Sequence, residues 1–297
     1  MHVIDEAIIG LGSVIDKNQP KGGRDLQSFL ALYYAARAFH CVKLTKNILD
    51  RFPSRDAIGI VRTVYECILR ARFAFSGNYA AETLIAQASS GSGHILQKIG
   101  VGGKVNRGWI VDKRSGKEFR AHTRFSDMAG SSGSKVDASI HEELYPFLCG
   151  VAHADLADFH MYFSPEEGFF AQRHKGRNPE TPLLVVAISI LLMAELSRVP
   201  GLTQRSRRDA LFIARKHAAL LGAFSARFPE LSIFAGMPQL KARMDFLSKQ
   251  KLKRRRVRSG SELTRERGCC HLAERLMSVL LEGRAPYSSG SVVKSSG

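Results

Sequence analysis

The sequence has no hydrophobic run long enough to cross a membrane. Its longest apolar run, Leu183–Ala194, contains twelve residues and is followed by Glu195. As a helix this run would rise about 18 Å, whereas the hydrocarbon core of a bilayer is about 30 Å thick. The first residues also differ from a secretory signal peptide, because Asp5 and Glu6 stand where such a peptide carries basic residues. We therefore expect a buried core helix at 183–194 and no membrane partner.

Cysteine is scarce, and its spacing does not suggest paired ligands or disulfides. There are five cysteines and no Cys-x-x-Cys pair: Cys41, Cys67, Cys149, Cys269 and Cys270. The first three lie in apolar helical patterns, where a free thiol behaves as a small hydrophobic side chain. An odd number of cysteines without a pairing pattern is typical of a reducing compartment. The sequence therefore predicts a cytoplasmic protein.

Acidic residues are outnumbered, with 27 Asp and Glu against 44 Lys and Arg. The net charge is +6 over residues 1–150, −2 over 151–200 and +13 over 201–297. Such a field attracts polyanions such as RNA. The candidate nucleic-acid-binding residues are the basic side chains of two runs: Arg205, Arg207, Arg208, Lys251, Lys253, Arg254, Arg255, Arg256 and Arg258. These runs contain no aromatic residue, so they predict phosphate contact without base stacking, or simply a solvated helix end.

Apolar residues recur at three- and four-residue steps along most of the chain, as is typical of helices. We predict an all-α protein: a helical bundle over 1–200, a basic helical extension over 201–283 and a disordered tail over 284–297. The first boundary is expected at Pro200-Gly201, where the composition becomes basic. The expected helices lie at about 3–16, 25–50, 54–75, 79–99, 138–163, 182–200, 205–227, 238–252 and 261–282.

A glycine-rich stretch at about 100–138 interrupts the helical pattern. Within it, Trp109–Asp112 and Lys117–Arg120 are separated by Lys-Arg-Ser-Gly, which is compatible with a small hairpin or with an extended loop. Irregular stretches of this length inside a domain are often functional or mobile. The sequence leaves these alternatives open.

One group of polar residues falls on apolar helices. Arg62 and Glu66 are four residues apart and share a helix face, and buried charges need partners. His40 lies near the middle of the preceding helix, and Tyr145 and His153 lie on the helix at 138–163. We treat these five residues as candidate catalytic residues that a bundle could bring together. The alternative is a structural Arg62–Glu66 pair whose hydrogen bonds Tyr145 and His153 complete.

The residues around this group resemble a widespread bacterial family of all-helical domains of unknown function. Its two signatures are an Arg-x-x-x-Glu helix, found here in DAIGIVRTVYECILRARFAF, and a later Tyr-x-x-Leu-x-x-x-x-His helix, found here at Tyr145–His153. The resemblance covers about 25–200 and matches Arg62, Glu66, Tyr145 and His153. It implies a helical fold and brings no established reaction with it.

The helical layout of that family is in turn similar to HEPN-type proteins, many of which are metal-independent ribonucleases of toxin–antitoxin and phage-defence systems. Their Arg-x(4–6)-His motif occurs here only as Arg265-x5-His271, outside the resembling region. In an RNA-directed protein of this type, His153 would move a proton, Arg62 would stabilise the phosphate and Glu66 would orient them. The alternative is a non-catalytic module that binds nucleic acid, a partner protein or a second copy.

Metal and cofactor signatures are weak. His153 and His160 are seven residues apart, about 10.5 Å along a helix, which is too far for one ion without ligands from other helices. The segment Gly100–Lys104 departs from a phosphate-binding loop because Val105 follows the lysine in place of Ser or Thr. We therefore expect no cofactor and no metal.

Overall fold

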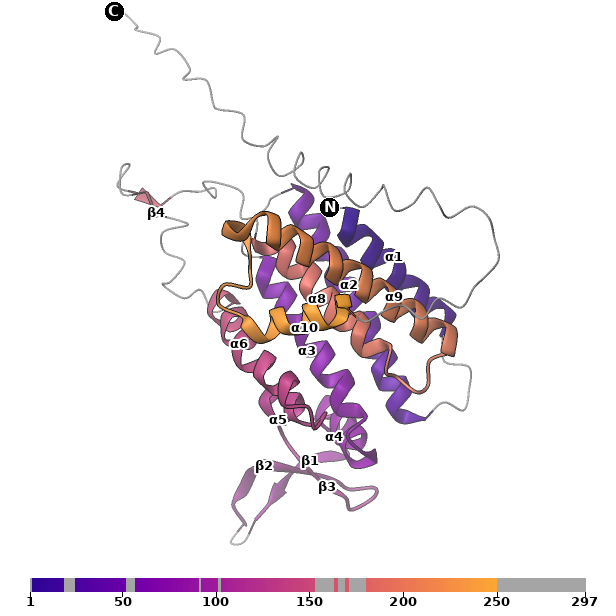
Figure 1. Cartoon of the computed structure of the whole chain (residues 1–297). Coiled ribbons are helices and arrows are strands. Elements are labelled where there is room, and N and C mark those ends of the chain that lie inside the picture. The colour runs from indigo at the N-terminus through magenta and orange to yellow at the C-terminus, as the bar shows by residue number, and fades with distance from the viewer. Residues whose placement is uncertain are drawn as a thin grey trace, which may run out of the picture. The chain divides into compact units, whose positions relative to one another are not determined.

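Helices make up most of the chain in this computed structural model, which describes residues 2–18, 25–51, 57–90, 92–100, 103–152, 163–164, 169–170 and 180–249 (Figure 1). The helices are α1 (His2–Lys17), α2 (Leu26–Arg51), α3 (Ile58–Ala74), α4 (Asn78–Ala88), α5 (Phe125–Gly130), α6 (Lys135–Ala152), α8 (Glu180–Leu196), α9 (Gln204–Arg227), η4 (Pro229–Leu231) and α10 (Pro238–Lys249). The strands are β1 (Ile95–Ile99), β2 (Val105–Asp112), β3 (Glu118–Arg120), β4 (Phe163–Ser164) and β5 (Phe169–Phe170). The predicted all-α class is confirmed.

The apolar helix α8 lies in the core of the bundle. It packs against α2, α3 and α9, and nearly all of its side chains are buried. A helix that is hydrophobic on every side must be surrounded in this way. The prediction of a buried core helix at 183–194 is therefore confirmed. No helix among the described residues is long and apolar enough to cross a membrane.

Helix α3 packs against α8, and also against α2 and α6. Its buried residues, which include Ile58, Val61, Tyr65 and Ile68, recur every three or four positions. Two contacts show the relative direction of α3 and α6. Arg62 near the start of α3 binds Tyr145 in the second half of α6, and Arg72 near the end of α3 pairs with Asp137 at the start of α6. The two helices are therefore antiparallel, and polar residues spaced along α3 meet α6 at separate levels.

Helices α9 and α10 pack against the helices that precede them and belong to the same hydrophobic core. Helix α9 packs against α8, and α10 packs against both α9 and α6. The Glu143 carboxylate of α6 accepts hydrogen bonds from the backbone N–H groups of Gln239 and Leu240, which satisfies the first turn of α10. One compact unit extends from Val3 to Leu252. The boundary predicted near residue 200 falls inside this unit.

Helix α1 is attached to α9 by both polar and close apolar contacts. Lys216 Nζ donates to Glu6 Oε2 at 2.6 Å, and the buried Asn18 side chain donates to Ser206 Oγ at 2.7 Å. At Gly10, an added Cβ would lie 2.3 Å from Cδ1 of Ile213. Glycine therefore allows the two helices to approach closely at this position.

The glycine-rich stretch forms a three-stranded antiparallel sheet in the order β1-β2-β3. The β2–β3 turn contains Gly116 at φ 70°, a conformation that glycine adopts without strain. The hairpin interpretation is confirmed for β2 and β3. The helix predicted over 79–99 is wrong at its end, because α4 stops at Ala88 and β1 begins at Ile95. The Ser- and Gly-rich residues between them end the helix, and Ile95 then enters a small core with Ile110 of β2.

Candidate functional site

Arg62, Glu66 and Tyr145 form a hydrogen-bonded cluster between α3 and α6, which we call the Arg62 cluster. Arg62 Nε donates to Glu66 Oε1 at 2.9 Å, and Arg62 Nη2 donates to the Tyr145 hydroxyl at 3.3 Å. The Tyr145 hydroxyl donates to the same Glu66 oxygen at 3.2 Å. The side chains of Arg62 and Glu66 are 22% and 20% exposed. The cluster is therefore tightly connected and still reaches solvent.

The surroundings of the Arg62 cluster set its protonation. Burial raises the pKa of Tyr145 to about 12, with the Glu66 charge adding to this effect and Arg62 opposing it. Burial by itself lowers the pKa of Arg62, but the hydrogen bond and charge of Tyr145 and the Glu66 charge outweigh it, so the pKa is raised. Near neutral pH the guanidinium is thus positive and can contact an anion, while the neutral phenol donates its single O–H to Glu66.

Aromatic rings hold Tyr145 in place. The His141 ring stacks on the Tyr145 ring, with the two centroids 4.8 Å apart. The Phe125 ring is tilted against the Tyr145 ring at a centroid distance of 5.4 Å. The Arg62 guanidinium lies 5.4 Å from the Tyr145 centroid, within the range of a cation–π contact. Tyr65 stacks on His141 at 6.0 Å. The phenol is therefore positioned by packing as well as by its hydrogen bonds.

A second charged cluster on α3 was not predicted from the sequence, and we call it the Arg72 cluster. Arg72 Nη2 lies 2.9 Å from Glu195 Oε2 of α8, and Nη1 lies 3.6 Å from Asp137 Oδ2 of α6. These three side chains are 11%, 13% and 4% exposed, and the half-exposed Arg198 lies 3.8 Å from both carboxylates. The only sequence signals are an arginine ten residues after Arg62 and a glutamate that ends the apolar run. Neither shows that the two meet.

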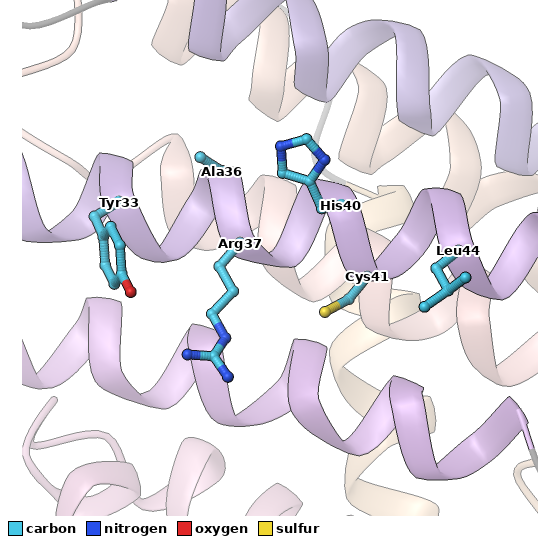
Figure 2. A pocket seen from close by; sticks show the side chains of 6 residues that line it. All are labelled: Tyr33, Ala36, Arg37, His40, Cys41 and Leu44. Atoms are coloured by element: carbon cyan, nitrogen blue, oxygen red, sulfur yellow. The ribbon is translucent and has the colours of Figure 1, made fainter.

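His40 lies away from the Arg62 cluster in the contacts of the described residues. It is exposed on α2 and forms an edge contact with Phe39, and no hydrogen bond or ring contact there joins it to Arg62, Glu66 or Tyr145. Figure 2 shows the side chains of Arg37 and His40 extending in different directions from the same side of α2. Both line a shallow, largely apolar groove with four other α2 residues: Tyr33, Ala36, Cys41 and Leu44.

The three predicted nucleic-acid-binding arginines that the structure describes lie in the first turns of α9. Arg205 and Arg208 are exposed, whereas Arg207 is partly buried and its Nε has no hydrogen-bond partner there. The other predicted residues of this kind lie outside the described residues: Lys251, Lys253, Arg254, Arg255, Arg256 and Arg258. The N-terminal two turns of α9 therefore offer two accessible positive charges.

His153 also lies outside the described residues, as does His160. The predicted helix 261–282 and the predicted disordered tail 284–297 also lie outside the described residues. Within the described part of the chain, no group of three His, Cys, Asp or Glu residues could hold a metal ion. The geometry on which function can be argued is therefore the Arg62 cluster and the surfaces around it.

No family model matches this chain, and neither a curated protein nor a solved structure is significantly similar to it. The resemblance to the bacterial helical family and to HEPN-type proteins therefore stays a prediction from the Arg62, Glu66, Tyr145 and His153 motifs.

Proposed function

We propose that the protein is an RNA-directed, HEPN-like module of the cytoplasm in which the Arg62 cluster contacts a phosphodiester. Arg62 donates hydrogen bonds to the phosphate oxygens, and Glu66 and Tyr145 orient its guanidinium. His153, eight residues after Tyr145 in the sequence, takes the proton of the 2′-hydroxyl as this oxygen attacks the phosphorus, and the bond to the 5′-oxygen breaks. The departing 5′-oxygen takes up a proton from the protonated His153 or from water, which leaves a 2′,3′-cyclic phosphate and a 5′-hydroxyl. The reaction class is metal-independent RNA cleavage.

The observation that carries this proposal is the partial exposure of the Arg62 cluster. Charged groups that serve only to hold helices together can be completely enclosed, as Asp137 nearly is at 4% exposure. Arg62 and Glu66 keep about a fifth of their side-chain surface in solvent although apolar residues surround them on α3. A guanidinium that is both positioned and accessible is what phosphate recognition requires.

A non-catalytic binding module is the second candidate, and a different observation favours it. Arg62 is already hydrogen-bonded to Glu66 and Tyr145, so the cluster also satisfies the requirements of a structural ion pair. In this case the basic segment 251–258 holds the nucleic acid or an acidic partner, and the Arg62 cluster contributes stability only.

The two candidates differ in the effect of His153→Ala. The full chain is incubated with an end-labelled single-stranded RNA and with an oligonucleotide of the same sequence that lacks 2′-hydroxyl groups. Under the first candidate only the RNA is cleaved, and His153→Ala lowers cleavage about 100-fold or more while binding is unchanged. His160→Ala is the matched control, because it removes another histidine from the same segment and should cleave normally.

Under the second candidate, truncation after residue 250 removes binding, and neither histidine variant changes it. Arg62→Gln tests the phosphate contact and should lower RNA cleavage under the first candidate. Arg70→Gln, on the same helix, is its matched control and should cleave normally. A protein that neither cleaves nor binds RNA or DNA at low salt contradicts the first candidate and the nucleic-acid-binding form of the second.

A further inference from the structure

The three-stranded sheet has one face attached to the bundle and one face directed away from it. Ile95, Ile110 and Phe119 form a small core with Ala86 of α4, and Tyr79 stacks on Phe119 at 5.6 Å. Because side chains alternate along a strand, their neighbours point to the opposite face. Figure 1 shows the sheet next to α4 at one end of the helices.

Polar contacts hold this sheet firmly on α4. The Tyr79 hydroxyl donates to the carbonyl of Glu118 at 2.9 Å, and Gln87 Nε2 donates to the carbonyl of Arg120 at 2.9 Å. Lys117 of the β2–β3 turn forms an ion pair with Glu82 at 2.9 Å. The sheet is thus fixed at β3, and its free face has a defined orientation.

An aromatic ring and an exposed positive charge meet on the free face, and a second exposed arginine lies close to them in the sequence. The register places Trp109 of β2 directly opposite Arg120 of β3. Arg107 lies two residues before Trp109, in the part of β2 that bulges out of register with β1. Arg107 and Arg120 are exposed, and within the described part of the chain neither has an ion pair. Leu96 and Val111 lie opposite each other on this face and extend its apolar surface.

The segment that forms the sheet is strongly basic. Residues 94–124 contain eight Lys or Arg and only two acidic residues, Asp112 and Glu118. Glu118 forms an ion pair with Lys98, and Asp112 accepts hydrogen bonds from Ser115 and from the backbone of Arg114. The register places Glu118 opposite Val111 on the free face, where Lys98 balances its charge, so Arg107 and Arg120 supply the unbalanced charges near Trp109.

We propose that this face, defined by Trp109, Arg120, Leu96 and Val111, together with Arg107 of the neighbouring bulge, binds single-stranded nucleic acid. A base stacks on Trp109, and the two arginines contact the adjacent phosphates. The indole can stack only on a base that is not already stacked in a duplex, which favours single strands. The inference rests on the proposed function for the choice of RNA as the natural strand, and it locates where that strand lies.

Trp109 is the single tryptophan of the chain, so its fluorescence reports on this face alone. The full chain is titrated at low salt with a single-stranded RNA whose 2′-oxygens are methylated to prevent cleavage, with the single-stranded DNA of the same sequence and with duplex DNA. Binding is measured in parallel from the anisotropy of a labelled strand. Both single strands should quench the Trp109 emission, and the dissociation constant from quenching should equal the one from anisotropy. The duplex should quench the emission less.

Substitutions then test the individual contacts. Trp109→Ala should weaken single-strand binding about 5- to 150-fold, the equivalent of one stacked base, and Trp109→Phe should retain most of the affinity. Arg107→Gln combined with Arg120→Gln should reduce the slope of log K against log salt by about 1.4. Lys241→Gln, which removes an exposed charge from α10, should leave the affinity for the strand unchanged.

The outcomes separate this inference from the proposed function. Binding by anisotropy without a change in Trp109 emission overturns the inference and leaves RNA cleavage possible. Quenching by both single strands, with no cleavage of RNA, supports the inference and contradicts the catalytic proposal. Equal quenching by poly-glutamate overturns the stacking role, because the face would then bind any polyanion. No binding of any strand at low salt overturns the inference.

Discussion

The Arg62 and Arg72 clusters lie on the same face of α3, ten residues apart and thus about 15 Å along the helix axis. Each joins an arginine of α3 to a side chain of α6, and each contains at least one carboxylate. They differ in solvent access, since the Arg72 cluster is enclosed by α6 and α8, whereas the Arg62 cluster is about a fifth exposed. Residue types alone therefore do not distinguish an enclosed ion pair from an accessible one.

The difference also predicts which cluster matters for stability. An ion pair that has lost its water depends on every partner, because removal of one leaves an uncompensated buried charge. A partly exposed pair can exchange a lost partner for water. We therefore expect the Arg72 cluster to contribute mainly to stability and the Arg62 cluster mainly to function.

The largest effect is expected for Arg72→Leu. This substitution leaves Asp137 and Glu195 buried with only the half-exposed Arg198 nearby, so the free energy of unfolding should fall by about 3–5 kcal/mol. Urea unfolding followed by circular dichroism measures the change. A loss as small as that of an exposed pair, below about 1 kcal/mol, would show that the Arg72 cluster is not effectively buried.

A smaller effect is expected for the coupling between Arg72 and Glu195. The double variant Arg72→Leu, Glu195→Leu should be more stable than the sum of the two single losses predicts, by about 1–3 kcal/mol, because it removes both charges together. A double-mutant cycle of urea unfolding measures this coupling. The same cycle with Lys241→Gln in place of Glu195→Leu should be additive, and coupling there would point to a general loss of structure.

Arg62→Leu should cost only about 1 kcal/mol of unfolding free energy, because Glu66 and Tyr145 can turn to water. Under the proposed function the same substitution abolishes the phosphate contact, so RNA cleavage should fall far more than stability does. Unfolding and cleavage are measured on one protein sample. A stability loss as large as that of Arg72→Leu would favour the structural interpretation of the Arg62 cluster.

The smallest effect is a pH dependence that originates at His141, which lies between the two clusters. Burial lowers its pKa, and the nearby Arg72 charge adds to this while Glu142 opposes it. Because the unfolded histidine titrates near 6.5, the unfolded chain binds more protons just below that pH. Stability should be constant above about pH 6.5 and fall as the pH decreases from there toward the lowered pKa.

His141→Phe tests this dependence while keeping a ring between Tyr65 and Tyr145. Its urea midpoint should change less than that of the unsubstituted chain between about pH 8 and about pH 5.5. An equal change in both proteins would assign the dependence to other groups.

Much of the fold could be predicted because helical periodicity is a local property of the sequence. The helices predicted at 3–16, 25–50 and 205–227 correspond closely to α1, α2 and α9. The prediction over 79–99 was wrong where a polar Ser- and Gly-rich run separates two apolar stretches. There the segment forms a strand because Ile95 packs against Ile110 and Phe119, which are distant from it in the sequence.

The sequence by itself determined that this chain forms helices, that 183–194 is buried and that Arg62 shares a helix face with Glu66, because spacing along a helix sets these relations. Only the tertiary structure decided that Tyr145 joins this pair, that His40 faces a groove elsewhere and that Arg72 finds Glu195 across the bundle. It also placed Trp109 beside Arg120. The reason is physical: solvent access and contacts between distant residues depend on how the helices and strands pack, and no local pattern encodes them.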